Sequence, residues 1–116
     1  MTKYFLRIAS IAVLAIGCDP FDPVARPLTV AITSPKTNLA VAEIVSFRLE
    51  ATGSSLNEVS VDFGDGTNEA RGTAGAQTAS ANFPHQFSTA GTFHVVGFAT
   101  EAGGTTVRDT VIVVVQ

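Results

Sequence analysis

Apolar and polar residues alternate along most of the chain with the two-residue period of a half-buried β-strand. This alternation runs through residues 28–33, 45–51, 59–63 and 93–100, and residues 105–116 are mostly β-branched. Gly, Pro, Ser and Asn separate the runs, and no helical period appears over a useful window. The pattern predicts an all-β, antiparallel sandwich of about seven strands in two sheets.

The inward positions of these runs supply the predicted core, which comprises Phe47, Val61, Phe63, Phe93 and Val95. Gly64-Asp65-Gly66 predicts a tight turn directly after Phe63, because Gly tolerates positive φ and Asp bonds its own backbone. Residues 67–84 are rich in Ala, Gly, Thr and Ser. We expect a loop or a loosely paired edge hairpin there.

The amino-terminal residues follow a different pattern. Lys3 and Arg7 precede the uncharged residues 8–17, which are too few for the ~20 that span a bilayer but match the ~7–15 of a secretory signal. Ala15-Ile16-Gly17-Cys18 resembles the lipobox of bacterial lipoproteins. The resemblance implies that residues 1–17 are a signal peptide and that Cys18 carries the lipid that anchors the protein. The alternative is that Cys18 is a buried thiol in an ordinary helix.

A proline-rich segment follows the cysteine. Residues 18–27 contain Pro20, Pro23 and Pro27, and proline disfavours both helix and sheet because it lacks the backbone donor and fixes φ. We expect an extended tether that lifts the domain by at most about 30 Å at ~3.1 Å per residue. The folded domain is then expected to comprise residues 28–116.

Composition narrows the function classes. The chain has 116 residues, 15% of them charged, with a formal net charge of −3 and one cysteine. This length fits one domain, and the absence of a Lys/Arg cluster argues against nucleic-acid binding. With Cys18 used for lipid, no second cysteine is left for a disulfide. We therefore expect a lipid-anchored domain at the bacterial cell envelope, facing the periplasm or the exterior.

Three ordered motifs resemble the PKD (polycystic kidney disease) domain family: Val61-Asp62-Phe63-Gly64-Asp65-Gly66-Thr67, His85-Gln86-Phe87 and Ala90-Gly91-Thr92-Phe93-His94-Val95. The resemblance spans residues 28–116 and implies an immunoglobulin-like sandwich. It also implies a non-catalytic role, the binding of an envelope protein or a carbohydrate outside the cytoplasm. Gly97 stands where the family usually has a bulky apolar residue, so a lighter core is expected.

Candidate chemistry is sparse. His85 and His94 are the only histidines and belong to no catalytic motif, so no catalytic residue is predicted, and a hydrolase would need more convergent polar groups. We expect His85 to bond to backbone at a turn. Asp62 and Asp65, with Glu69 nearby, are a candidate weak calcium site, because calcium prefers carboxylate oxygens and some PKD domains bind it. The alternative is a solvated turn. No other metal or cofactor is predicted.

An apolar set is predicted on the outward face of the last two strands. If these strands pair in the expected register, the set comprises Val96, Phe98, Ile112 and Val114. A contiguous exposed apolar patch marks a partner site. The alternative function is therefore a structural spacer or subunit of an envelope assembly that associates through this face. Cover by residues 67–84 or a shifted register would bury the same side chains.

Overall fold

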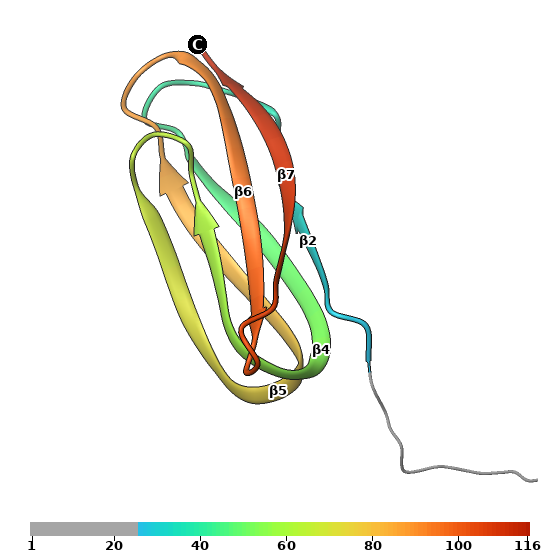
Figure 1. Cartoon of the computed structure of the whole chain (residues 1–116). Helices are drawn as coiled ribbons and strands as arrows, with labels where there is room; N and C mark the ends of the chain where they lie inside the picture. The colour runs from blue at the N-terminus through green and yellow to red at the C-terminus, as the bar shows by residue number, and fades with distance from the viewer. Residues whose placement is uncertain (1–25) are drawn as a thin grey trace, which may run out of the picture.

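The computed structural model describes residues 26–116, so the predicted signal peptide and Cys18 lie outside the described residues. The described part is built of strands alone, which confirms the all-β prediction. The strands are β2 (Thr29–Thr33), β3 (Asn38–Leu39), β4 (Ile44–Asp62), β5 (Asn68–Gln86), β6 (Gly91–Glu101) and β7 (Thr106–Val115) (Figure 1). No helix among residues 26–116 is long and apolar enough to cross a membrane.

The two longest strands each contribute to both layers of the sandwich. Residues 44–52 of β4 pair with β2 and with the second half of β5. After a register shift, residues 56–62 of β4 pair with the first half of β5 and with β6, which pairs with β7. A short parallel pairing of β3 with β7 completes the second layer. The six described strands therefore form one continuous hydrogen-bonded sheet that folds into two layers. The prediction was about seven short strands in two separate sheets.

Each long strand bends where it passes between the layers. In β4 the bend includes Gly53, where a Cβ atom would lie 2.8 Å from Glu101 Oε2. Glu101 accepts a hydrogen bond from the backbone N–H of Ser54 at 2.7 Å, which holds the bend against the end of β6. In β5 the bend lies at Ala74 and Gly75, which have φ of 53° and 82°. Both bends lie at the same end of the molecule (Figure 1).

The segment 67–84 departs from its prediction. It lies at an edge, as expected, but residues 68–86 form one strand of 19 residues rather than a loop or a loosely paired hairpin. This strand pairs with β4 along most of its length. Backbone hydrogen bonds to the equally long β4 hold it in place although its side chains are small, and these bonds leave no periodic apolar signal in the sequence.

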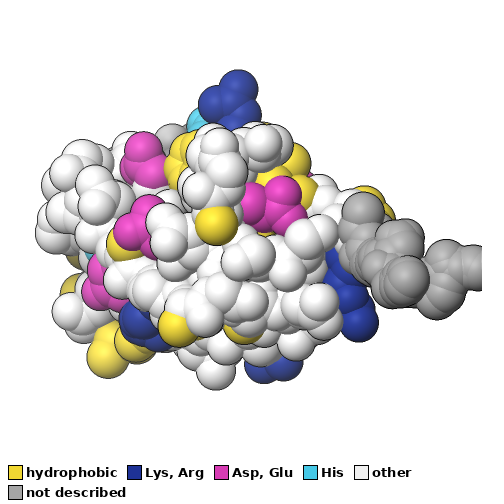
Figure 2. Space-filling model, turned by 60° about the horizontal axis from the view of Figure 1, so that its bottom comes forward, with side chains coloured by type: hydrophobic (Ala, Val, Ile, Leu, Met, Phe, Trp, Pro, Cys, Tyr) yellow, Lys and Arg dark blue, Asp and Glu magenta, His cyan; other side chains and the backbone are white. Residues whose placement is uncertain are grey.

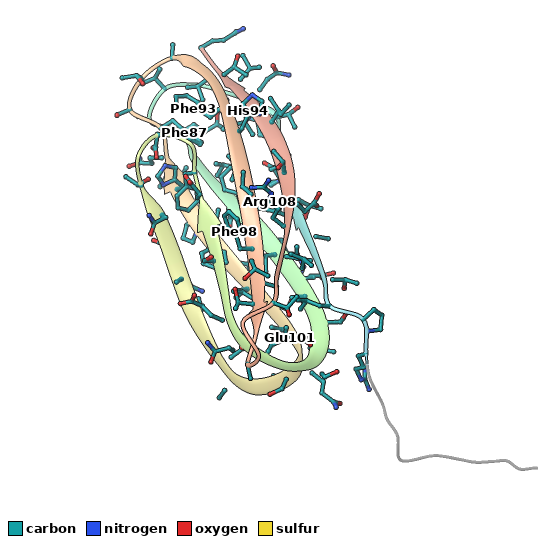
Figure 3. The ribbon with its side chains drawn as sticks, in the orientation of Figure 1. Phe87, Phe93, His94, Phe98, Glu101 and Arg108 are labelled. Atoms are coloured by element: carbon teal, nitrogen blue, oxygen red, sulfur yellow. The ribbon has the colours of Figure 1, made fainter. Side chains whose placement is uncertain are left out.

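The core fills the space between the layers with aromatic and β-branched side chains. Of the predicted core residues, Phe47, Val61, Phe63 and Val95 are at most 1% exposed, which confirms their prediction. Phe93 is only partly buried, because it lies beside the edge of the core and stacks on Phe87 with ring centroids 4.6 Å apart (Figure 3). The remaining fully buried aromatic rings are Phe83 and Phe87, which the alternation did not single out.

Gly97 marks a close approach of the two layers. A Cβ atom at this position would lie 2.7 Å from Leu49 Cδ1 and 3.2 Å from Ile32 Cβ. The first layer therefore fills the volume that a bulky residue at position 97 would need. The small residue at position 97 therefore leaves no cavity in the core, because the side chain of Leu49 fills the space.

The two long sides of the sandwich differ. On one side β2 packs against β7, and the backbone N–H of Ile32 donates to Asp109 Oδ2 at 3.1 Å, which joins the layers. On the other side both layers end in a half of β5, and no further described strand pairs with it. We call this second side the open side.

Candidate functional site

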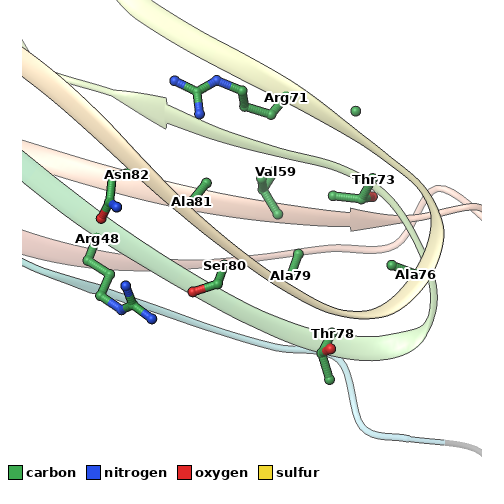
Figure 4. A pocket seen from close by; sticks show the side chains of 11 residues that line it. Arg48, Val59, Arg71, Thr73, Ala76, Thr78, Ala79, Ser80, Ala81 and Asn82 are labelled. Carbon is green, nitrogen blue, oxygen red and sulfur yellow. The ribbon is translucent and has the colours of Figure 1, made fainter.

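A groove of about 870 Å³ follows the open side between the two halves of β5 (Figure 4). Arg71 and Thr73 line it from the first half, residues 78–82 from the second half, and Val59 and Arg48 from β4. Successive side chains of a strand point to opposite faces. A groove lined by five consecutive residues therefore runs along the edge of the strand and not over one face of it.

The groove exists because the side chains around it are short. Ala76, Ala79 and Ala81 line it, and none of them reaches across to the facing half of β5. At one point a longer side chain covers the core, because the Arg71 guanidinium lies 4.4 Å from the centroid of the Phe83 ring. This cation–π contact shields Phe83 and places a positive charge at the rim.

Both charged residues that line the groove are arginines. Arg48 Nε donates to Glu50 Oε2 at 2.8 Å, and Arg71 Nη2 lies 3.5 Å from Glu69 Oε1. A guanidinium has five N–H groups, so each arginine keeps donors for another acceptor. The rim therefore offers positively charged hydrogen-bond donors.

One buried hydroxyl in the groove lacks a partner. Thr73 Oγ1 is buried and makes no hydrogen bond to any described residue. Most buried polar atoms in folded proteins are hydrogen-bonded, so an unpartnered hydroxyl in a groove calls for an explanation. A ligand with a hydrogen-bonding group would satisfy it.

Of the two predicted calcium residues, Asp62 is the last residue of β4 and Asp65 lies in the turn that follows. Asp62 Oδ1 accepts from the N–H of Gly64 at 2.9 Å, and Asp65 Oδ1 accepts from the N–H of Thr67 at 3.1 Å. Both carboxylates thus cap backbone groups of the turn. Glu69 instead points to Arg71, and residues 26–116 bring together no group of three His, Cys, Asp or Glu side chains that would hold a metal ion.

His85 binds Asp65 rather than backbone. Its Nε2 lies 2.8 Å from Asp65 Oδ2, and its ring stacks on Phe63. Burial raises the pKa of the Asp65 carboxyl, but the hydrogen bonds from Thr67 and His85 lower it by more, so this pKa lies below its ordinary value of 3.8. The expectation of a backbone partner was wrong, because residue 85 lies across from a turn that is twenty positions away in sequence. His94 is exposed.

The predicted apolar face lies on the outward side of β6 and β7, but polar residues divide it. Ile112 pairs with His94, Val96 pairs with Thr110, and Phe98 pairs with Arg108 (Figure 3). Ile112 is 50% exposed, whereas its three apolar companions are half-buried: Val96, Phe98 and Val114. On the view of Figure 2, apolar side chains likewise form small areas between polar ones.

Comparison with known proteins gives the fold. No family model matches the chain, and no curated protein matches it. Among solved structures it is similar to the PKD domain of an M14-like peptidase from Thermoplasmatales archaeon SCGC AB-540-F20, with a TM-score of 0.68, 21% identity, and coverage of 79% of this chain and 98% of that one.

A second similar structure is the CARDB domain of a Pyrococcus furiosus protein, solved in complex with di-metal ions. The TM-score is 0.57 at 16% identity, over 77% of this chain and 92% of that one. At these identities the likeness concerns the fold. The described chain has the PKD-like, immunoglobulin-like fold that the ordered motifs predicted.

Proposed function

We propose that the chain is a non-catalytic, lipid-anchored module of a bacterial cell envelope that binds a protein or carbohydrate outside the cytoplasm. The observation that carries the binding role is the groove on the open side, which combines spare arginine donors with an unpartnered hydroxyl. Support for the anchor comes from the Ala15-Ile16-Gly17-Cys18 motif. Fold alone does not fix function, so the proposal depends on this site.

The groove favours binding over catalysis. His85 is engaged with Asp65 and Phe63, and His94 lies on the outward face of β6. Neither histidine lines the groove. Its side chains can donate hydrogen bonds and charge, but they include no group that titrates near neutral pH and would act as a general base.

The position of the amino-terminal end suits a tethered module. The backbone N–H of Arg26 donates to Ser54 Oγ at 3.2 Å, so the described chain begins beside the bend of β4. The carboxyl terminus lies at the opposite end of the sandwich (Figure 1). A lipid at Cys18 would hold the bend end toward the membrane and leave the groove along the side accessible.

The test combines labelling with capture. Bacteria that produce the full-length protein are fed a labelled fatty acid, and envelope extract is then passed over the acylated protein and over a Cys18→Ser variant. We expect label on the wild-type protein alone and capture of the same envelope component by both folded forms. Label on the variant, or wild-type protein in the cytosol with residues 1–17 attached, overturns the anchor. Capture of nothing by either form overturns the binding role.

A second candidate is a spacer or subunit that associates through the outward face of β6 and β7. The 50% exposure of Ile112 on the outward face of β7 favours it. The Phe98→Asp variant tests it, with Thr110→Asp on the same face as the control for added charge. Loss of association in the first variant alone, with folding intact, supports assembly through this face.

A further inference from the structure

We propose that the groove takes an extended peptide that carries an acidic side chain and that adds a strand to the free edge of β5. This proposal deepens the binding function proposed above and rests on it. It commits to a peptide rather than a carbohydrate, for the reasons that follow.

The first reason is the free edge itself. β5 is 19 residues long and pairs with β4 only, so the backbone groups along its other edge have no strand partner among the described residues. Natural edge strands are usually protected by charged side chains or proline. Residues 72–83 contain neither. An edge of this length without protection suits strand addition.

The second reason is the direction of the groove. Because residues 78–82 line it consecutively, their backbone faces it as well as their side chains. An added strand gains affinity from main-chain hydrogen bonds and specificity from pockets for its alternate side chains. The short side chains of Ala79 and Ala81 leave room for such side chains beside Val59. Phe83 is buried beneath Arg71 and therefore offers no exposed aromatic face on which a sugar ring could stack.

The third reason is charge. Arg48 and Arg71 line the groove, and although Glu50 and Glu69 pair with them, each guanidinium keeps N–H donors that a carboxylate of the peptide can engage. Thr73 Oγ1 supplies an additional polar group that has no partner in the described protein. Together these groups indicate which peptide fits the groove. It has an extended backbone and one carboxylate, and the residues beside the carboxylate are small or β-branched.

Pairing of one half of β5 with the same half in a second copy does not suit a tethered module, and pairing of the first half with the second half of another copy is left to the sedimentation test below. Two identical edges related by a two-fold axis must run antiparallel. Both halves of β5 lie along the long axis of the sandwich, the first half running toward the bend end and the second half away from it (Figure 1). Antiparallel pairing would therefore place the amino-terminal ends of the two copies at opposite ends of the pair. Two copies anchored in one membrane have these ends on the same side, whereas a separate peptide is free to pair in either direction.

The test uses a synthetic probe and the acylated full-length protein in detergent. The probe is a fluorescein-labelled nonapeptide of alternating Thr and Val with a central Glu, and fluorescence anisotropy measures its binding. One matched peptide has Lys in place of Glu, and another is N-methylated at consecutive residues, so that neither edge of its backbone can donate hydrogen bonds. We expect saturable binding of the Glu peptide, binding about tenfold weaker for the Lys peptide, and none for the methylated one.

Protein variants locate the site. Arg71→Gln and Thr73→Val are expected to weaken binding of the Glu peptide several-fold, and the Thr73 change keeps the shape of the side chain while it removes only the hydroxyl. Arg108→Gln and Thr110→Val, on the outward face of β7, are the matched controls and should bind as the wild type does. Circular dichroism checks that each variant is folded.

Four outcomes overturn the proposal: no binding of the Glu peptide, equal binding of the Glu and Lys peptides, equal binding of the methylated peptide, or no effect of both groove variants. Sedimentation of the protein alone supplies a fifth, because dimers that Thr73→Val dissociates would assign the edge to a second copy. None of these results touches the labelling of Cys18 or the capture of an envelope component. Failure of the peptide site is therefore distinguishable from failure of the proposed function.

Discussion

The imidazole ring of His85 lies flat against the ring of Phe63, with centroids 3.8 Å apart and planes 2° from parallel. Phe87 meets the same imidazole edge-on at 4.7 Å, and Asp65 bonds its Nε2. The histidine thus covers the end of the core with one face and fixes the turn after β4 with its edge. This one side chain joins the turn to a strand that lies twenty residues later in the sequence.

Replacement of His85 by Ala is expected to lower the free energy of unfolding by about 1–2 kcal/mol. The variant loses an aromatic stack and a hydrogen bond to a carboxylate, and it exposes Phe63. Urea unfolding followed by circular dichroism measures the change. His94→Ala is the control, because His94 is exposed, and its effect should stay within about 0.5 kcal/mol. Equal effects of the two variants would contradict the structural role of the stack.

Asp65 is expected to make stability depend on acidity. Its pKa lies below 3.8 in the folded protein, so the folded state binds the proton less tightly than the unfolded state does. The stabilisation is then fully present above the unfolded pKa and is lost as the pH falls through the folded pKa.

Urea unfolding at several pH values between about 5 and about 2 measures this effect as the difference between wild type and Asp65→Asn. We expect the difference to shrink as the pH falls. Glu43, whose pKa the hydrogen bond from Lys36 lowers, titrates in both proteins and cancels in the comparison. A difference that stays constant over this range would show that the Asp65 carboxylate contributes nothing.

Gly97→Ala is expected to destabilise the protein by about 1–3 kcal/mol, because the new methyl group would overlap Leu49 Cδ1. Thermal or urea unfolding measures the loss. Gly103→Ala is the matched control, since a Cβ there meets nothing within 4 Å. In the double variant with Leu49→Val the two changes should be less than additive, because the shorter side chain makes room. Full additivity would mean that the layers do not meet at this point.

Asp109→Ala is expected to loosen β2 and to cost about 1 kcal/mol, because the N–H of Ile32 loses its acceptor. Hydrogen exchange read by NMR is the sharper measurement. Exchange at the Ile32 amide should speed up more than exchange in β6. Thr110→Ala, the neighbouring exposed residue on the same strand, should leave the Ile32 amide protected.

The sequence predicted the layers and much of the core because alternation reports burial directly. Phe47 and Val61 alternate with polar neighbours, and each is buried. Phe93 fits the same pattern but lies at the edge of the core, where the period of two cannot tell a central position from a peripheral one. Phe83 ends a weaker alternation, in which Ala79 and Ala81 alternate with Ser80 and Asn82, and alanine is too small to give a strong apolar signal.

The groove could not be predicted in the same way. It depends on the pairing of β4 with all of β5, and backbone pairing leaves no trace in a segment of Ala, Gly, Ser and Thr. The contact of Arg71 with Phe83 likewise joins residues from opposite layers. Such contacts depend on the bend at Ala74 and Gly75, where both residues have positive φ. Only Gly75 indicates this bend in the sequence, because glycine adopts positive φ readily. The sequence shows that this segment has few large side chains. It does not show that the segment leaves one side of the sandwich open.

The pairing of β2 with β4 determines how the domain responds to a pull on its amino-terminal end. β2 begins at the end where the chain enters and runs along the sandwich, antiparallel to β4, over five paired positions. A force on that end, resisted at the opposite end, acts along the strands. It therefore loads the hydrogen bonds of this ladder together in shear instead of opening them one after another like a zipper. β2 is therefore placed to resist such a force.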